Sequence, residues 1–438
     1  MNNKLKGPKT AVTEKAVPEF ESGMDRKCLL AIGTGILLRL IFFTAFPSLP
    51  TTLAQRVEIS TPVTSYKRLQ EGIYLYTHGV SPYDGGVFHQ APLLLSLFTI
   101  LPSSTTITNL LYILADLLSA ISLVQIAASG VPATTPHHVS PRKANTWPPW
   151  AIAAAFLFNP FSIATCIARP TIVFTNCIVL HAIASAVQGR RAPAFISLAM
   201  ASYLSLYPVL LFPPLLLLTY DSSKSPSRPS IQTFAIVTTV LFTTVLLTYL
   251  KLSHILTGSW EFVASTYGVH LLLPDLTPNV GLWWYFFIEM FDSFRAFFLC
   301  LFQLHLLIYV PGICLRLRKQ PLFALITLVG ISSIFKSYPA IGDTTLYLSL
   351  LALYNHTFPP MRYTFFLAAA LLYASFLGPA FYYLWVYAGS GNANFFYAIT
   401  LVWSIVNALI VADALYAVLR DEHETERPEL IGKDVVQI

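Results

Sequence analysis

Charged residues are scarce in this sequence. Of its 438 residues only 11% are Asp, Glu, Lys or Arg, whereas 55% are hydrophobic. A soluble domain carries about a quarter charged residues, so this chain cannot cover a surface that faces water. In lipid, only α-helices and closed β-barrels satisfy every backbone hydrogen bond. Barrel strands alternate apolar and polar residues. Here the apolar runs are long and continuous, which predicts an all-α polytopic membrane protein.

Cysteine is also scarce, and its spacing excludes several kinds of site. No pair of the five cysteines has C-x-x-C spacing, which argues against a disulfide framework or a zinc site. All five lie in or beside apolar stretches, where a thiol most often serves as a small packing residue: Cys28, Cys166, Cys177, Cys300 and Cys314. We therefore expect no metal, no cofactor and no cysteine nucleophile in this chain.

Apolar runs divide most of the chain into membrane segments. A spanning helix needs about 20 apolar residues, and the candidates are 28–46, 107–128, 149–166, 170–187, 231–250, 283–314, 321–336, 341–358, 361–387 and 395–419. The run 91–102 is too short to cross. The run 193–219 contains three prolines, which break helices. We read it as two half-spans in a hairpin bent at "SLYP".

These segments predict one multi-spanning domain, 28–419, with about eleven or twelve membrane segments. The tails, 1–27 and 420–438, are polar, and we expect them to be disordered or simply solvated. The first apolar run is not followed by a small-residue cleavage site, so we read it as a signal anchor that stays in place.

Basic residues predict the orientation. Cytoplasmic loops of membrane proteins carry an excess of Lys and Arg. Here the basic residues of both tails and of several short loops fall on one side, so we expect both tails to be cytosolic. The other side, lumenal, then carries loops near 47–90, 251–282 and 388–394. Basic residues that gather in short loops set the topology and do not suggest nucleic-acid binding.

Asn355 begins the only N-x-S/T sequon, and we expect no glycan on it because it lies at a cytosolic helix end.

Ionisable residues within membrane segments are costly and are functional candidates by default. They are Arg39, Asp116, Glu289, Asp292, Arg295, Lys336, Asp343 and Asp413. Glu289, Asp292 and Arg295 are spaced by three, so two of them can pair on one helix face. We favour an internal ion pair that positions a helix over a role in chemistry.

Three stretches on the lumenal side carry polar groups among aromatic residues. The first, "SPYDGGVFHQAPLL", contains His89, which we read as a hydrogen-bonded structural residue. The second, "PDLTPNVGLWWYFFIEMF", places an aromatic cluster where a helix enters the bilayer, as an interfacial belt does. The third, "AGSGNANFFYAIT", carries Asn392 and Asn394 at the start of the last span. One asparagine is expected to cap this helix. Two amides beside small residues could also face a sugar or a phosphate.

Together these stretches resemble the PIG-U family of membrane subunits of GPI transamidase. "IFKSYPAIGDTTLYLSLLALYNH", "FNPFSIATCIARPT" and "SLYP" extend the resemblance from about residue 28 to 420. It implies a non-catalytic subunit in the endoplasmic reticulum membrane that binds and positions the GPI lipid. The implied partners are a caspase-like subunit, PIG-K, which holds the catalytic cysteine, and PIG-T, PIG-S and GPAA-type subunits. The candidate GPI-binding residues are Asn392 and Asn394, with Asp275 and Asn279 as weaker candidates.

The main alternative is an enzyme. PIG-U also resembles multi-spanning mannosyltransferases of the GT-C type, which use dolichol-phosphate mannose, and the predicted fold is of that type. Those enzymes carry a pair of acidic residues early in the first lumenal loop. The matching stretch here reads "RVEIST", so Glu58 has Ser60 where a second carboxylate would stand. The missing partner disfavours glycosyl transfer. A transporter would also fit broken helices and buried charges, but no inverted repeat supports it.

Overall fold

The computed structural model describes residues 25–223, 229–431 and 433, and nearly all of its regular structure is helical. Six helices in this part of the chain are long and apolar enough to cross a membrane, and a bent pair would make a seventh span. The six are α1 (Arg26–Ala45), α5 (Thr105–Ala128), α11 (Ile231–Thr257), α15 (Asp292–Arg316), α18 (Thr364–Val386) and α19 (Ala393–Glu426). The all-α membrane fold is confirmed.

Shorter elements fill the bundle and its two ends. The bent pair is α6 (Pro149–Leu157) and α7 (Pro160–Ala168). The remaining helices of the bundle are α8 (Ile172–Val187), α9 (Arg191–Leu204), η2 (Tyr207–Leu211), α10 (Phe212–Ser222), α16 (Pro321–Phe335), α17 (Ile341–Leu351) and η4 (Ala352–Thr357). Connecting elements are α2 (Leu49–Ala54), α3 (Tyr66–Thr77), α4 (Pro92–Ile100), η1 (Lys143–Asn145), α12 (Glu261–Val263), η3 (Ala264–Gly268), α13 (Val269–Leu272), α14 (Trp283–Ile288) and η5 (Pro428–Leu430). Two-residue strands β1 (Thr134–Thr135) and β2 (His138–Val139) pair antiparallel.

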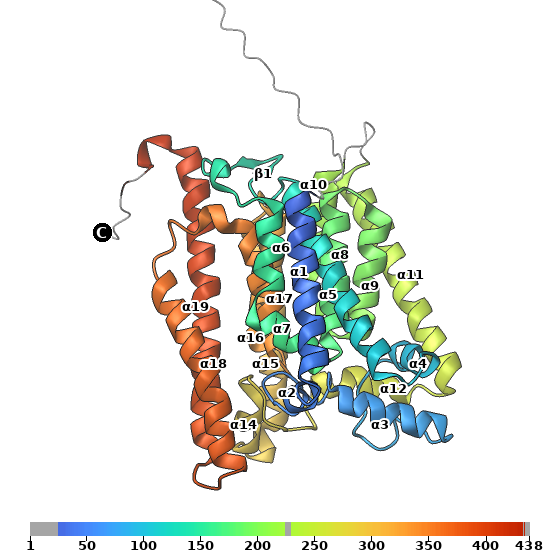
Figure 1. The fold of residues 1–438 in the computed structure, drawn as a ribbon. Coiled ribbons are helices and arrows are strands. Elements are labelled where there is room, and N and C mark those ends of the chain that lie inside the picture. Colours follow the sequence, from blue (N-terminus) through green and yellow to red (C-terminus); the bar gives the residue numbers. More distant parts are fainter. Residues whose placement is uncertain (1–24, 224–228, 432, 434–438) are drawn as a thin grey trace, which may run out of the picture.

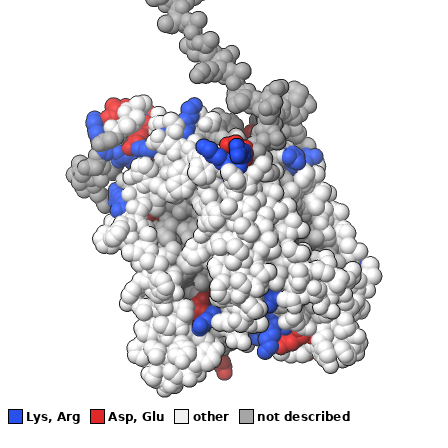
Figure 2. All heavy atoms as spheres, viewed as in Figure 1, with Lys and Arg blue, Asp and Glu red and all other residues white. Residues whose placement is uncertain are grey.

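The bundle has two distinct ends (Figure 1). We name the end where α1 begins and α19 ends the basic end, and the opposite end, where α2, α3 and α4 lie, the loop end. Figure 2 shows charged side chains gathered near both ends of the visible face, with an almost uncharged belt between them. Such a belt is what the hydrocarbon core of a bilayer requires. A membrane therefore fits around the middle of the bundle.

The hairpin predicted for 193–219 is present. The chain descends in α9, turns through η2 at Pro208 and returns in α10. Its two ends meet, because a Cβ placed on Gly189 would lie 2.7 Å from the carbonyl oxygen of Ser222. α4 has only nine residues, which at 1.5 Å per residue give a length of about 14 Å. It lies at the loop end (Figure 1) and is too short to cross, as predicted.

One predicted span, 283–314, is wrong as a single helix. The structure breaks it between Glu289 and Phe291, separating α14 from α15. Glu289 therefore lies outside α15. Asp292 and Arg295, which have opposite charges, do share α15, but no ion pair joins them in the described chain, so the expected pair is missing. Arg295 instead donates to the carbonyl oxygen of Leu273 at 2.6 Å and lies over the ring of Phe287. It ties α15 to the loop that precedes α14.

The last helix is longer than predicted. α19 continues to Glu426, and residues 420–426 do not form a solvated tail. Asp421 is buried and accepts hydrogen bonds from Arg142 at 2.7 Å and His138 at 3.1 Å. Glu422 accepts from Gln320 at 3.0 Å. Acidic side chains of α19 thus fasten the loop around β1 and β2, and the start of α16, at the basic end. Residues 1–24 and 434–438 of the predicted tails lie outside the described residues.

A buried ion pair joins the first helices. The guanidinium of Arg39 is fully buried on α1 and contacts the carboxylate of Asp116 on α5 at 2.6 Å. The same guanidinium donates to the carbonyl oxygen of Leu157 at 2.9 Å and to the hydroxyl of Ser162 at 3.0 Å. Those residues flank the 54° bend between α6 and α7. Pro160, which has no N–H, begins α7 at this bend. Arg39 therefore holds four helices together where one of them is broken.

We expect Arg39→Met to destabilise the protein strongly. It would leave Asp116 as an uncompensated buried charge, which costs about 3–5 kcal/mol. Thermal unfolding of the purified protein in detergent measures the loss. The matched control is Lys67→Met, which removes one partner of an exposed pair with Glu71 at 3.9 Å and should leave the melting temperature unchanged. Equal melting temperatures for the two variants would contradict this assignment.

Candidate functional site

The two asparagines predicted as a binding pair lie exposed where the turn after α18 leads into the first turn of α19. Asn392 is the N-cap of α19, and its side-chain oxygen accepts from the backbone N–H of Phe395 at 3.3 Å. The side-chain oxygen of Asn394 accepts from the hydroxyl of Tyr285 on α14. Neither amide nitrogen donates to another group in the described chain. Capping by one asparagine is therefore present, and both amides keep donors that face outward.

An aromatic cluster lies against this turn. Trp284 of α14 is almost fully buried and stacks on Trp385 of α18, with ring centroids 6.2 Å apart. Tyr285 packs on Tyr397 of α19 at 4.6 Å, and Phe396 contacts Trp284 at 5.9 Å. The predicted aromatic cluster of 283–287 therefore divides: Trp284 and Tyr285 join α14 to α18 and α19, whereas the other three rings pack against Phe302 of α15. Trp284 and Tyr285 fix where the two asparagines stand.

Asp275 and Asn279 occupy a different place, in the extended segment before α14. Asp275 forms an ion pair with Arg68 at 2.8 Å and accepts two hydrogen bonds from Thr277. Burial raises the pKa of Asp275, but the hydrogen bonds from Thr277 and the charge of Arg68 outweigh it, so this pKa lies below its ordinary value. Asn279 is fully buried, donates to the carbonyl oxygen of Thr277 at 3.1 Å and accepts from the N–H of Gly281 at 2.8 Å. Both side chains hold the segment in shape, and no hydrogen bond in the described chain links them to Asn392 or Asn394.

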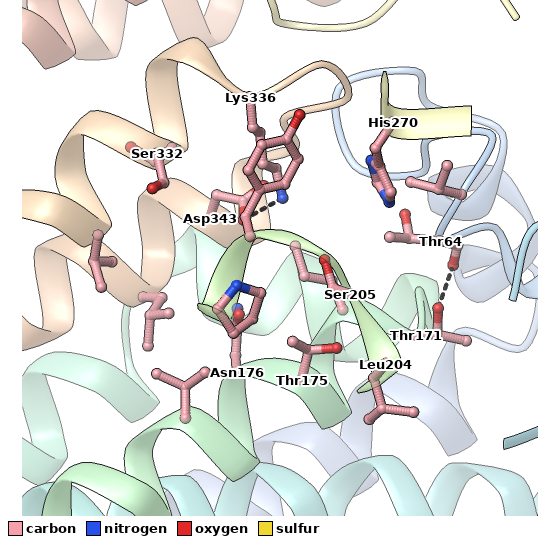
Figure 3. A pocket seen from close by; sticks show the side chains of 18 of the residues that line it. Thr64, Thr171, Thr175, Asn176, Leu204, Ser205, His270, Ser332, Lys336 and Asp343 are labelled. Carbon is pink, nitrogen blue, oxygen red and sulfur yellow. Dashed lines mark hydrogen bonds and ion pairs between the residues drawn. The ribbon is translucent and has the colours of Figure 1, made fainter. Parts of the chain in front are cut away.

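A polar cavity lies inside the bundle, and the sequence analysis did not identify it (Figure 3). Its volume is about 80 Å³. The polar residues that line it come from five helices and from the connections between helices: Thr64, His89, Thr171, Thr175, Asn176, Ser205, Tyr207, His270, Ser332, Ser333, Lys336 and Asp343. They gather where α9, α16 and α17 end or begin. The signals in the sequence were polar interruptions such as "SLYP" and "FKSYPAIGD", which predict breaks and do not show that the breaks meet.

One ion pair and a hydrogen-bond network surround this cavity. The ammonium of Lys336 lies 2.6 Å from the carboxylate of Asp343, which also accepts from the N–H of Ala340 at 2.9 Å. Both charged side chains had been singled out as costly in a membrane. Ser337 contacts both the hydroxyl of Tyr207, at 3.0 Å, and the imidazole of His270, at 3.2 Å. These bonds fix the positions of the side chains that face the cavity.

His89 is held as predicted, but it has one open nitrogen. Its Nδ1 donates to the carbonyl oxygen of Ser265 at 2.9 Å. Because a carbonyl can only accept, Nδ1 carries the proton and Nε2 of the neutral ring is an acceptor. Nε2 is buried without a partner in the described chain. Burial lowers the pKa of His89 below its ordinary value, so the ring is neutral at pH 7.

Glu58 is enclosed and isolated. Its backbone oxygen accepts from the N–H of Ile341 at 2.9 Å, but both carboxyl oxygens are buried without a hydrogen-bond partner in the described chain. Burial raises its pKa. Glu58 does not line the polar cavity. Among the described residues there is no cluster of His, Cys, Asp and Glu that could hold a metal ion. Within the described part of the chain, Glu58 thus has no carboxylate partner for acid–base chemistry.

Comparison with known proteins gives one consistent result. The chain matches the family described as GPI transamidase subunit PIG-U over residues 33–403. It is 34% identical to the human GPI-anchor transamidase component PIGU over 419 residues, covering 91% of this chain and 95% of that protein. It is 36% identical to the GPI transamidase component GAB1 of Saccharomyces cerevisiae over 411 residues, covering 92% of this chain and 98% of that protein. The chain therefore belongs to the PIG-U family of GPI transamidase subunits.

Proposed function

We propose that this chain binds the GPI lipid and positions it for attachment to the C-terminus of precursor proteins, without forming or breaking bonds itself. The observation that carries the proposal is the exposed turn at the loop end, where Asn392 and Asn394 present free amide donors beside an aromatic cluster. Amide N–H groups donate to sugar hydroxyls and phosphate oxygens. The N-terminus of α19 adds the positive end of a helix dipole, which favours a phosphate group.

The adjoining helix supplies a surface for acyl chains. α18 is 23 residues long, and only 17% of its apolar window is buried inside the protein. Large apolar side chains in the half of α18 nearer the turn, such as Phe376, Tyr383 and Val386, are 71%, 54% and 48% exposed. A lipid whose head group reaches the turn after α18 can lay its chains along this helix.

The proposed setting is the endoplasmic reticulum membrane, with the basic end cytosolic and the loop end lumenal. In this orientation both tails are cytosolic, and the segments 47–90, 251–282 and 388–394 are lumenal. The partners are the caspase-like subunit PIG-K, which carries the catalytic cysteine, together with PIG-T, PIG-S and GPAA-type subunits. Four of the five cysteines of this chain are buried, which agrees with a nucleophile supplied by another subunit.

The first test separates lipid binding from helix capping. Asn392→Ser keeps an oxygen that can cap α19 but removes the amide donor. We expect it to lower GPI attachment about fivefold, the effect of losing one hydrogen bond of about 1 kcal/mol. Asn392→Ser combined with Asn394→Ala should lower it further. Surface display of a GPI-anchored reporter in cells that lack the endogenous subunit measures attachment.

Co-purification of the other subunits is the control for assembly in this test. The matched control variant is Tyr285→Phe, which removes the hydroxyl bonded to Asn394 and keeps both amides. It should retain attachment. An assembled complex that carries the double change and attaches GPI at the normal rate would falsify the proposal for these residues.

The second test concerns Glu58. If it were the general base of a mannosyltransferase, Glu58→Gln would lower the rate by about 10²–10⁴-fold. We expect attachment to stay nearly unchanged, because the carboxyl group is enclosed and has no second carboxylate beside it. Glu71→Gln, at an exposed acid of the same segment, is the control. A large loss with normal protein level and assembly would favour the transferase instead.

The third test establishes the side of the membrane. Gly79 is exposed, has φ of +73° and offers open space around an added Cβ. Asparagine tolerates this left-handed backbone, and Gly79→Asn creates a glycosylation sequon with Val80 and Ser81. We expect an endoglycosidase-sensitive mass shift, which the added change Ser81→Ala abolishes. The natural sequon at Asn355 should stay unmodified. A glycan on Asn355 and none on residue 79 would reverse the proposed orientation.

A further inference from the structure

We propose that the polar cavity at the meeting point of α8, η2, α16 and α17 binds one uncharged polyhydroxyl ring, such as a hexose or inositol. This goes beyond the proposed positioning of the GPI lipid, because no candidate residue at the exposed turn lines this cavity. The ring is either free in solution or carried by a lipid.

Several side chains face the cavity with hydrogen-bonding capacity to spare. The hydroxyls of Thr175, Ser205 and Ser332 line it, and none of them bonds to another group of the described chain. Asn176 donates to the carbonyl oxygen of Gly342 at 2.8 Å, which leaves its side-chain oxygen open. Hydroxyl groups both donate and accept. These positions match a ligand that also presents hydroxyls.

Two buried histidines add open ring nitrogens. Nε2 of His89 is an acceptor without a partner, as argued above. Nδ1 of His270 lies 3.2 Å from the hydroxyl of Ser337, and its Nε2 has no partner in the described chain. Burial and the nearby charge of Lys336 lower the pKa of His270 to about 3. Both rings are therefore neutral at pH 7, and both are at least nine-tenths buried.

The charge balance favours an uncharged ligand. The cavity contains one cation, Lys336, and one anion, Asp343, and they neutralise each other at 2.6 Å. Figure 3 shows this pair on one side of the cavity and His270 across from it. A phosphate would be repelled by Asp343 and would find no second cation among the lining residues. Ring hydroxyls can instead donate to the carboxylate and accept from the ammonium at once.

The size and the walls agree with a ring. A water molecule needs about 10–15 Å³ of such a volume, and the cavity has about 80 Å³. Apolar side chains complete the lining: Val63, Ile172, Val179, Leu204, Pro208, Leu211, Val329 and Leu346. Ligand sites commonly combine apolar walls with a few convergent polar groups. The C–H faces of a sugar or cyclitol ring would lie on these walls, beside Tyr207.

The test uses the assembled complex, purified in detergent, and three soluble probes: myo-inositol, methyl α-mannoside and inorganic phosphate. Saturation-transfer NMR detects binding and gives its affinity. The diagnostic variant is Thr175→Val with Ser332→Ala, which removes two cavity hydroxyls that hold nothing in the chain. Folding should survive it. We expect a ring probe to bind and the variant to weaken its binding about four- to a hundredfold, since each of the two lost hydrogen bonds contributes a factor of about two to ten.

Matched controls come from neighbouring helices. Thr327→Val and Ser349→Ala remove hydroxyls that bond to carbonyl oxygens of their own helices, α16 and α17, outside the cavity lining. Both should bind the ring normally. The double variant Asn392→Ser with Asn394→Ala should also bind the ring normally. If the exposed turn is not the GPI site, this double variant attaches GPI normally; if the cavity is not a ring site, the ring probes fail to bind or bind regardless of Thr175→Val with Ser332→Ala. Phosphatidylinositol in mixed micelles, as competitor, distinguishes a lipid-borne ring from a free one.

Three results would overturn the inference. Phosphate binding without ring binding would make the cavity an anion site. No binding of any probe would leave it a water-filled space. Ring binding that is unchanged by Thr175→Val with Ser332→Ala would place the ring elsewhere in the complex.

Discussion

The contact between the Arg39 guanidinium, the Asp116 carboxylate and the carbonyl oxygen of Leu157 is the constraint from which much of this bundle follows. A helix broken at membrane depth leaves carbonyl groups without partners, and lipid cannot supply them. Arg39 satisfies one such carbonyl and is itself neutralised by Asp116. The break can then persist, and α7 leads through Arg169, in a left-handed conformation, to the start of α8. The wall of the polar cavity begins there.

The same physical problem recurs at two other breaks and is solved with polar side chains. Between α9 and η2, and between α16 and α17, the helical hydrogen-bond pattern stops, so backbone groups need partners from side chains. The hydroxyl of Tyr267 donates to the carbonyl oxygen of Tyr203 at the end of α9 at 2.6 Å. The hydroxyl of Tyr207 accepts from the N–H of Ser337 at 3.1 Å, and the carboxylate of Asp343 accepts from that of Ala340. Because both breaks fall at similar depth, the groups that repair them meet. The cavity is thus a consequence of placing two hairpin turns side by side.

Sequence patterns predicted those features that are local. The proline positions predicted the hairpin bent at Pro208. The shortness of the run 91–102 predicted a helix that does not cross the membrane, and the position of Asn392 predicted a helix cap. Hydropathy failed for 283–314, because apolar and aromatic residues lie on both sides of the break, and the charged residues Glu289, Asp292 and Arg295 at the break were interpreted as an ion pair within one helix. Contacts between residues far apart in the sequence could not be predicted from these patterns either. Tyr285 and Asn394 are 109 positions apart, and the cavity lining is drawn from seven separate stretches.

The exposed turn and the polar cavity differ in whether their polar groups can be satisfied without a ligand. An exposed amide such as Asn394 is hydrated when no ligand is bound, so its occurrence needs no special cause. The cavity is different, because Nε2 of His89 is buried and gains no partner in the described chain, and the half-buried hydroxyls of Thr175, Ser205 and Ser332 face the same space unbonded. A buried acceptor such as Nε2 costs about 1–3 kcal/mol unless something else bonds to it. None of these hydroxyls holds a broken helix together, because none bonds to another group of the described chain. They and Nε2 of His89 are therefore the groups that the proposed occupant of the cavity would satisfy.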